Sequence, residues 1–84
     1  MMQQGQGGVT GPQQIPVGGS ITVKVDTGDA YVTVTGGGKA VKYDVVNGSA
    51  TIQAPPDVAA GQSFWVIAGK GGKTKYLRVE VIEN

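Results

Sequence analysis

Short runs in which apolar and polar residues alternate, separated by glycine-rich segments, dominate the chain from Pro16 onward. An alternation with period two places every second side chain on one face of an extended strand, so each run offers one apolar face to a core. The runs cover residues 20–26, 30–36, 40–46, 49–54 and 75–83. Short strands with frequent turn signals are typical of an antiparallel β-sandwich or barrel.

The alternation also predicts which side chains meet in the interior. In the run 40–46 the inward positions are Val41, Tyr43 and Val45. Taking inward positions from all runs, we expect one dry layer between two sheets, with contributions from Ile21, Val32, Tyr43, Ile52, Phe64 and Val79.

The connections favour the same class of fold. Glycines in residues 26–29, 36–39, 47–49 and 70–73 supply the positive φ angles that tight turns need. The longest link, residues 55–62, begins with two prolines, and Pro56 cannot donate a ladder hydrogen bond. Such a link can carry the chain from one sheet to the other. The strand that follows, residues 63–69, is then expected to be central in its sheet.

This strand is apolar on both faces, which raises the question of what covers its second side. Phe64, Val66 and Ala68 are expected to point inward, and Trp65 and Ile67 outward. Two interpretations stay open. Either neighbours such as Tyr76 or the N-terminal segment screen these side chains, or they form an exposed patch that binds a protein or a sugar ring.

The first 14 residues differ in composition from the rest of the chain. They hold no charged residue and are rich in glycine and in the glutamines Gln3, Gln4, Gln6, Gln13 and Gln14. This composition predicts a flexible arm over residues 1–14, outside a domain formed by residues 15–84. The arm is either a disordered leader or a segment that orders against a neighbouring subunit. It lacks the apolar stretch of a signal peptide or a membrane span.

Composition argues against several function classes. The chain has no cysteine and no histidine, so thiolate chemistry, disulfides and the commonest acid-base and metal-binding side chain are absent. We therefore expect no catalytic residue, cofactor or metal. A net charge of +1 gives no long-range attraction for nucleic acid or an anionic membrane.

Three short strings resemble functional motifs but have simpler explanations. Asp26-Thr27-Gly28 matches the aspartic-protease triplet, yet a turn needs the same residue types. Residues 69–73 lack the spacing of a phosphate-binding loop. Lys70, Lys73 and Lys75 gather at this expected hairpin tip, where they either protect the sheet edge or contact an anionic partner.

The strings VNGSATIQAP, AGQSFWVIAG and LRVEVIE carry a resemblance to a known family. They resemble the C-terminal half of bacterial and bacteriophage immunoglobulin-like domains of the invasin and filamin type, over about residues 45–82. The resemblance implies an immunoglobulin-like sandwich of about seven strands without catalytic residues. The chain departs from antibody-type domains because both cysteines of the inter-sheet disulfide are missing.

These observations lead to two hypotheses for function. The first is a virion accessory, such as a capsid decoration (cement) protein, assembled in the host cytoplasm and docked through its arm and an apolar sheet face. The second is a cell-surface or secreted adhesion module whose Trp65, Tyr31, Tyr43 or Tyr76 stacks on sugar. Partners are then capsid or other assembly subunits, further copies of the chain, or a glycan.

Overall fold

Eight β-strands and no helix make up the described part of the computed structural model, which covers residues 8–69 and 74–83. The strands are β1 (Val9–Thr10), β2 (Gln14–Pro16), β3 (Ser20–Val25), β4 (Tyr31–Gly36), β5 (Lys39–Asp44), β6 (Ser49–Gln53), β7 (Ser63–Ala68) and β8 (Lys75–Ile82). The prediction of an all-β fold is confirmed.

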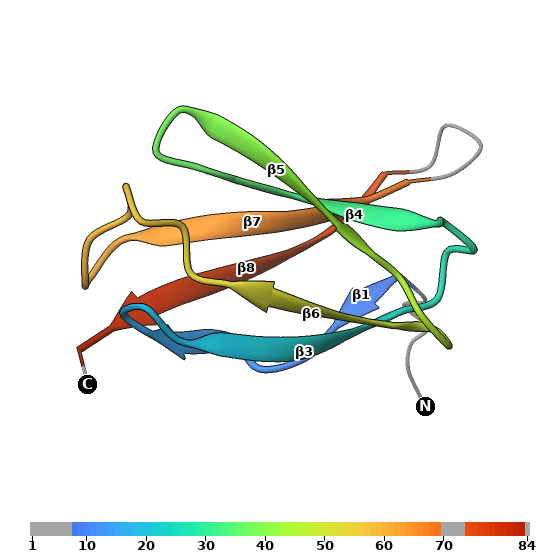
Figure 1. The fold of residues 1–84 in the computed structure, drawn as a ribbon, viewed down its shortest axis with the longest axis horizontal. Coiled ribbons are helices and arrows are strands. Elements are labelled where there is room, and N and C mark those ends of the chain that lie inside the picture. Colours follow the sequence, from blue (N-terminus) through green and yellow to red (C-terminus); the bar gives the residue numbers. More distant parts are fainter. Residues whose placement is uncertain (1–7, 70–73, 84) are drawn as a thin grey trace.

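The strands form two layers that pack face to face (Figure 1). One sheet has three strands in the order β1-β3-β6, and the other has five in the order β2-β8-β7-β4-β5. All pairings are antiparallel among the described residues except β2 with β8, which is parallel. The link after β6 crosses from the smaller to the larger sheet, as the two prolines predicted. It leads into β7, which lies at the centre of the five-stranded sheet.

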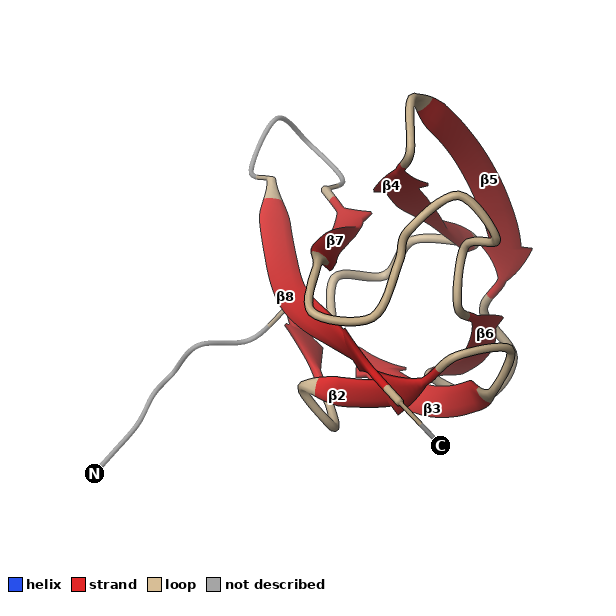
Figure 2. Cartoon of the chain, turned by 90° about the vertical axis from the view of Figure 1, so that its left-hand side faces the viewer, coloured by secondary structure: helices blue, strands red, loops and turns tan. Residues whose placement is uncertain are grey.

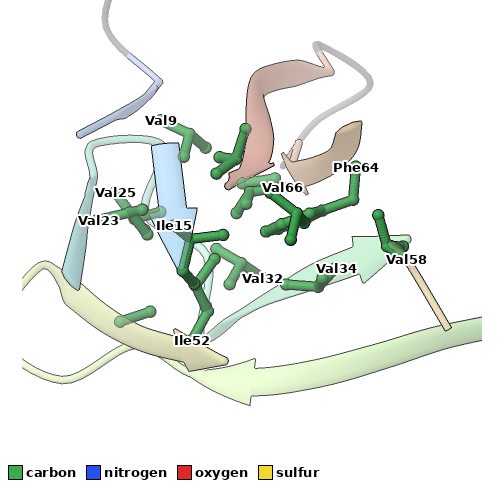
Figure 3. Close-up of a cluster of buried hydrophobic side chains, with 14 residues drawn as sticks. Val9, Ile15, Val23, Val25, Val32, Val34, Ile52, Val58, Phe64 and Val66 are labelled. Atoms are coloured by element: carbon green, nitrogen blue, oxygen red, sulfur yellow. The ribbon is translucent and has the colours of Figure 1, made fainter. Parts of the chain in front are cut away.

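The core lies between the sheets and consists of inward-facing aliphatic side chains around Phe64 (Figure 3). No polar or charged residue among those described is buried, because the alternation directs polar side chains outward. Val32, Ile52, Phe64 and Val79 are fully buried, as predicted, whereas Ile21 and Tyr43 are partly buried against the same cluster.

The inward prediction for β5 is wrong at one position. Val41 is 47% exposed, although Tyr43 and Val45 pack against the core. β5 is the outermost strand of the five-stranded sheet and lies over β6 of the facing sheet (Figure 2). Val41 lines a hollow between β5 and the link after β6, so its side chain stays open to solvent.

The N-terminal segment joins the fold earlier than the composition suggested. β1 and β2 lie within the predicted arm and its boundary, with Val9 opposite Val25 and Gln14 opposite Glu80. Val9 is buried in the core, so hydrophobic burial holds this segment to the body. A strand of two or three residues is too short to show a period in the sequence, which is why these strands were missed.

Two turns adopt the positive φ angles that their sequences predicted. Gly37 and Gly38 join β4 to β5 with φ of 61° and 81°, and Asn47 and Gly48 precede β6 with φ of 52° and 77°. Two consecutive positive angles are those of a type I′ turn. The segment with Asp26, Thr27 and Gly28 connects β3 to β4 in the other sheet, and Gly28 likewise has the predicted positive φ, of 80°. Thr27 Oγ1 donates a hydrogen bond to Asp29 Oδ2 there.

Candidate interaction surface

The outward side of the five-stranded sheet carries the exposed aromatic side chains that the sequence singled out. On β7 the side chains of Phe64 and Val66 enter the core, so Trp65 and Ile67 leave the sheet on the opposite side. Tyr76 on β8 is the cross-strand partner of Ile67. These three side chains line one shallow hollow.

Trp65 and Tyr76 contact each other edge to face. Their ring centroids are 5.1 Å apart and the ring planes meet at 89°. Trp65 nevertheless stays 41% exposed and Tyr76 63% exposed. Tyr76 therefore screens Trp65 in part, as the interpretation of screening by neighbouring strands predicted. The pair as a whole nevertheless remains exposed, as the interpretation of an exposed patch predicted.

The described part of the N-terminal segment does not cover this surface. β2 lies beside β8 in the plane of the sheet. There Glu80 N donates to Gln13 O at 2.9 Å, and Gln13 Nε2 donates to Arg78 O at 3.5 Å. Gln13 and Gln14 thus attach β2 to the sheet edge. Gln3, Gln4 and Gln6 lie outside the described residues.

β4 extends the surface beside Trp65 and Ile67. Thr35 lies opposite Trp65 and Thr33 opposite Ile67. Tyr31, two residues before Thr33 and so on the same side of the sheet, is 46% exposed. We call the set Tyr31, Thr33, Thr35, Trp65, Ile67, Tyr76 and Arg78 the outer face.

The charges at the two sides of the outer face sit next to aromatic rings. Lys42 on β5 places its Nζ 4.4 Å from the centroid of the Tyr31 ring, a cation-π contact. Arg78 on β8 is the cross-strand partner of Trp65. Lys42, Thr33 and Thr35 were not predicted as site residues. The signal was present, because they occupy the polar positions of the same alternating runs, but only the strand order brings them onto the same sheet face as Trp65.

The lysines proposed for an anionic partner are not assembled into a site by the described residues. Lys75 is exposed at the start of β8 and pairs with Ala68. Lys70 and Lys73 lie outside the described residues. Within residues 8–69 and 74–83, no group of three or more acidic side chains is placed to hold a metal ion.

A second hollow lies between β5 and the link after β6. Its lining includes Val34, Val41, Tyr43, Ala54 and Pro55. Lys39 Nζ and Asp57 Oδ2 form an ion pair of 3.6 Å at its rim. Both charged groups are well exposed, so this pair adds little to stability.

Comparison of the chain with family models, with curated proteins and with solved structures finds no match. Among the described residues there is also no helix that could cross a lipid bilayer.

Proposed function

We propose that this protein is a non-enzymatic binding module whose outer face docks on a larger partner. The observation that carries the proposal is the position of Trp65. It lies on the central strand of the larger sheet and still exposes 41% of its surface. An apolar residue at the middle of a sheet is buried on folding or on binding, and folding leaves Trp65 open.

The chemistry of the outer face supports a protein as the partner. Tryptophan, tyrosine and arginine are the residue types most often found as interface anchors, and Trp65, Tyr76 and Arg78 adjoin one another here. Thr33 and Thr35 add hydroxyl groups beside the rings without a net charge. The hollow at Trp65 is shallow, whereas small-molecule sites are usually deep concave pockets.

The strand order supports an immunoglobulin-like assignment as part of the proposal. In such domains strands A, B and E of one sheet face strands C, F and G of the other. Taking β1, β3 and β6 as A, B and E, and β4, β7 and β8 as C, F and G, reproduces both orders. β5 then extends the sheet next to C, and β2 lies next to G.

Within this class, we favour a virion accessory that decorates a capsid. The support comes from the sequence: a small cysteine-free body, an uncharged glutamine-rich segment and the resemblance to phage immunoglobulin-like domains. A test is co-sedimentation of the protein with capsids assembled from a shell protein encoded beside its gene. Loss of co-sedimentation in Trp65→Ala supports the role, and a wild-type protein that stays in the supernatant contradicts it.

The exposed rings favour one alternative function, the binding of a carbohydrate. Tyr31 and Tyr76 expose 46% and 63% of their surfaces, and aromatic faces can stack on sugar rings. A glycan array distinguishes the two functions. Hits that disappear in Tyr76→Ala and Trp65→Ala support the alternative, and an array without hits contradicts it.

The docking surface is tested by site-specific photocrosslinking. A photoreactive phenylalanine analogue replaces Trp65 in one version of the protein and Thr22, exposed on the outside of the three-stranded sheet, in the other. We expect a discrete adduct with one partner from position 65 and none from position 22. Equal adducts from both positions, or none from position 65 under any expression condition, would overturn the proposal.

A further inference from the structure

Two adjoining hollows at the outer face indicate which kind of partner segment it binds, an inference that rests on the proposed docking function. The aromatic hollow is the one lined by Trp65, Ile67 and Tyr76. A polar hollow adjoins it and shares Ile67. Its lining consists of Asp29, Tyr31, Thr33, Ile67, Ala68, Gly69 and Thr74. A segment that lies across Ile67 therefore contacts both hollows.

The polar hollow forms where the pairing of β4 with β7 stops before the end of β4. The last pair is Thr33 with Ile67, although β4 begins two residues earlier, at Tyr31. Ala30 O accepts a hydrogen bond from Val45 N on the side of β5, so the backbone groups of Tyr31 point to the opposite side, toward β7. Among the described residues the ladder gives these groups no partner. The polar hollow thus lies beside an unpaired N–H and C=O.

Charge distinguishes the two hollows. The lining of the aromatic hollow has no charged group, and that of the polar hollow has one, the carboxylate of Asp29. Thr27 Oγ1 donates a hydrogen bond to Asp29 Oδ2, which orients this carboxylate. Lys42 lies on the Tyr31 ring and forms no ion pair with it. A matching ligand is therefore apolar in the aromatic hollow and basic in the polar hollow.

The position of the hollows on a sheet face, rather than at an edge, restricts the backbone of the ligand. Between Trp65 and Ile67, β7 pairs with β4 on one side and with β8 on the other. An extended strand laid on this face would find no ladder to join. A polyproline II helix needs none, because it has no internal hydrogen bonds and proline has no N–H group. Aromatic-lined grooves are the usual binding sites of such helices.

The spacing of the two hollows matches one turn of a polyproline II helix. Tyr76 lies beside Ile67 on the side of β8, whereas Tyr31 and Thr33 belong to β4 on the other side. From the rise along a strand and the distance between strands, the centres of the hollows lie on the order of 9 Å apart. A polyproline II helix repeats every three residues, which is about 9 Å. A side chain in one hollow therefore places the third residue along the helix in the other.

We propose that the outer face binds a proline-rich segment of the partner as a polyproline II helix that carries a lysine or arginine three residues from a proline. The proline packs against Trp65 and Tyr76 in the aromatic hollow. The basic side chain pairs with Asp29 in the polar hollow. The N–H of Tyr31 is the donor for a carbonyl oxygen of the helix.

The chain has a single tryptophan, so the fluorescence of Trp65 reports directly on the aromatic hollow. The probe is a peptide with one arginine between two runs of four prolines, which offers the required spacing in both chain directions. We expect a saturable change with a Kd below about 1 mM. The same peptide with glutamate in place of arginine should bind at least about threefold more weakly. A peptide with glycine in place of every proline should show no saturation.

Two matched variants test the role of the carboxylate. Asp29→Asn removes the charge and keeps an oxygen that can accept from Thr27, so it should weaken binding of the arginine peptide at least about threefold and leave that of the glutamate peptide unchanged. Asp26→Asn removes an exposed carboxylate of the same loop outside both hollows, and we expect no change in affinity. Tyr76→Ala should weaken both peptides. Circular dichroism verifies that each variant is folded.

Four outcomes overturn the proposal. They are no saturable change with the arginine peptide, equal binding of the glycine peptide, an equal effect of Asp26→Asn and Asp29→Asn, and saturation by an oligosaccharide but not by the peptide. The crosslink from position 65 decides the docking function separately. A discrete adduct from position 65 without peptide binding refutes the proline-rich ligand alone, whereas the absence of an adduct refutes the docking surface and this inference with it.

Discussion

Two successive residues, Phe64 and Trp65, show how a single alternation separates stability from interaction. Both are large aromatic residues on the central strand, and their side chains leave the sheet on opposite sides. Phe64 is fully buried within the core cluster, whereas Trp65 contacts Tyr76 and remains partly exposed. Replacing each by alanine should therefore change different properties of the protein.

We expect Phe64→Ala to lower the free energy of unfolding by about 3 to 5 kcal/mol, because it removes buried surface and leaves a cavity. Trp65→Ala should cost about 1 kcal/mol, mainly the lost ring contact with Tyr76. Urea denaturation followed by circular dichroism measures both. Equal losses for the two variants would show that Trp65 belongs to the core and would remove the basis of the proposed surface.

At the scale of elements, the β4–β5 hairpin depends on its two-residue turn. Gly36 pairs with Lys39, and both Gly37 and Gly38 between them have positive φ. Only glycine adopts such angles without a steric penalty. The two positions differ in their surroundings, since an added β-carbon meets no atom within 4 Å at Gly38 but collides with Asp57 at Gly37.

This difference predicts unequal effects of two matched substitutions. Gly38→Ala should lower the free energy of unfolding by about 1 kcal/mol, the cost of a left-handed alanine. Gly37→Ala has the same conformational cost, and its added methyl group also collides with Asp57, which has to move. The free energy of unfolding should therefore fall by about twice as much as in Gly38→Ala. Thermal or urea unfolding compares the variants. A smaller effect at Gly37 than at Gly38 would contradict the packing of the turn against the link after β6.

At the scale of the whole molecule, the body includes a segment that the composition had placed outside it. β1 extends the three-stranded sheet beyond β3, and β2 extends the five-stranded sheet beyond β8. Asp26 N donates to Gly8 O at 2.7 Å, and Val17 N donates to Ile82 O at 2.9 Å. Both sheets are thus completed by residues before β3.

The contribution of β1 can be measured with two neighbouring substitutions. Val9 is buried and Thr10 is exposed. Val9→Asp introduces an unpaired carboxylate into the core and should lower the free energy of unfolding by more than about 1 kcal/mol. Thr10→Asp, the control, should stay within about 0.5 kcal/mol of the wild type. If the two variants have the same stability, β1 does not belong to the folded body.

The alternating runs alone determined the fold class, the five strands with a clear period and the inward direction of residues such as Val32, Ile52 and Val79. They also placed Trp65 and Ile67 on the outside. These predictions hold because the direction of a side chain in a strand follows from its own position in the chain. The predicted burial failed at single positions where it depended on the facing layer, as for Val41, which lines the hollow between β5 and the link after β6.

The tertiary structure alone decided which strands adjoin one another. Only the order β8-β7-β4-β5 brings Tyr31, Thr33 and Lys42 onto one sheet face with Trp65 and Tyr76. The tertiary structure also adds β1 and β2 to the two sheets. These strands have two and three residues, too few to show an alternation of apolar and polar residues in the sequence. The physical reason is that strand pairing joins residues far apart in the chain through backbone groups that are alike at every position, so the sequence pattern specifies the faces of a strand but not its neighbours.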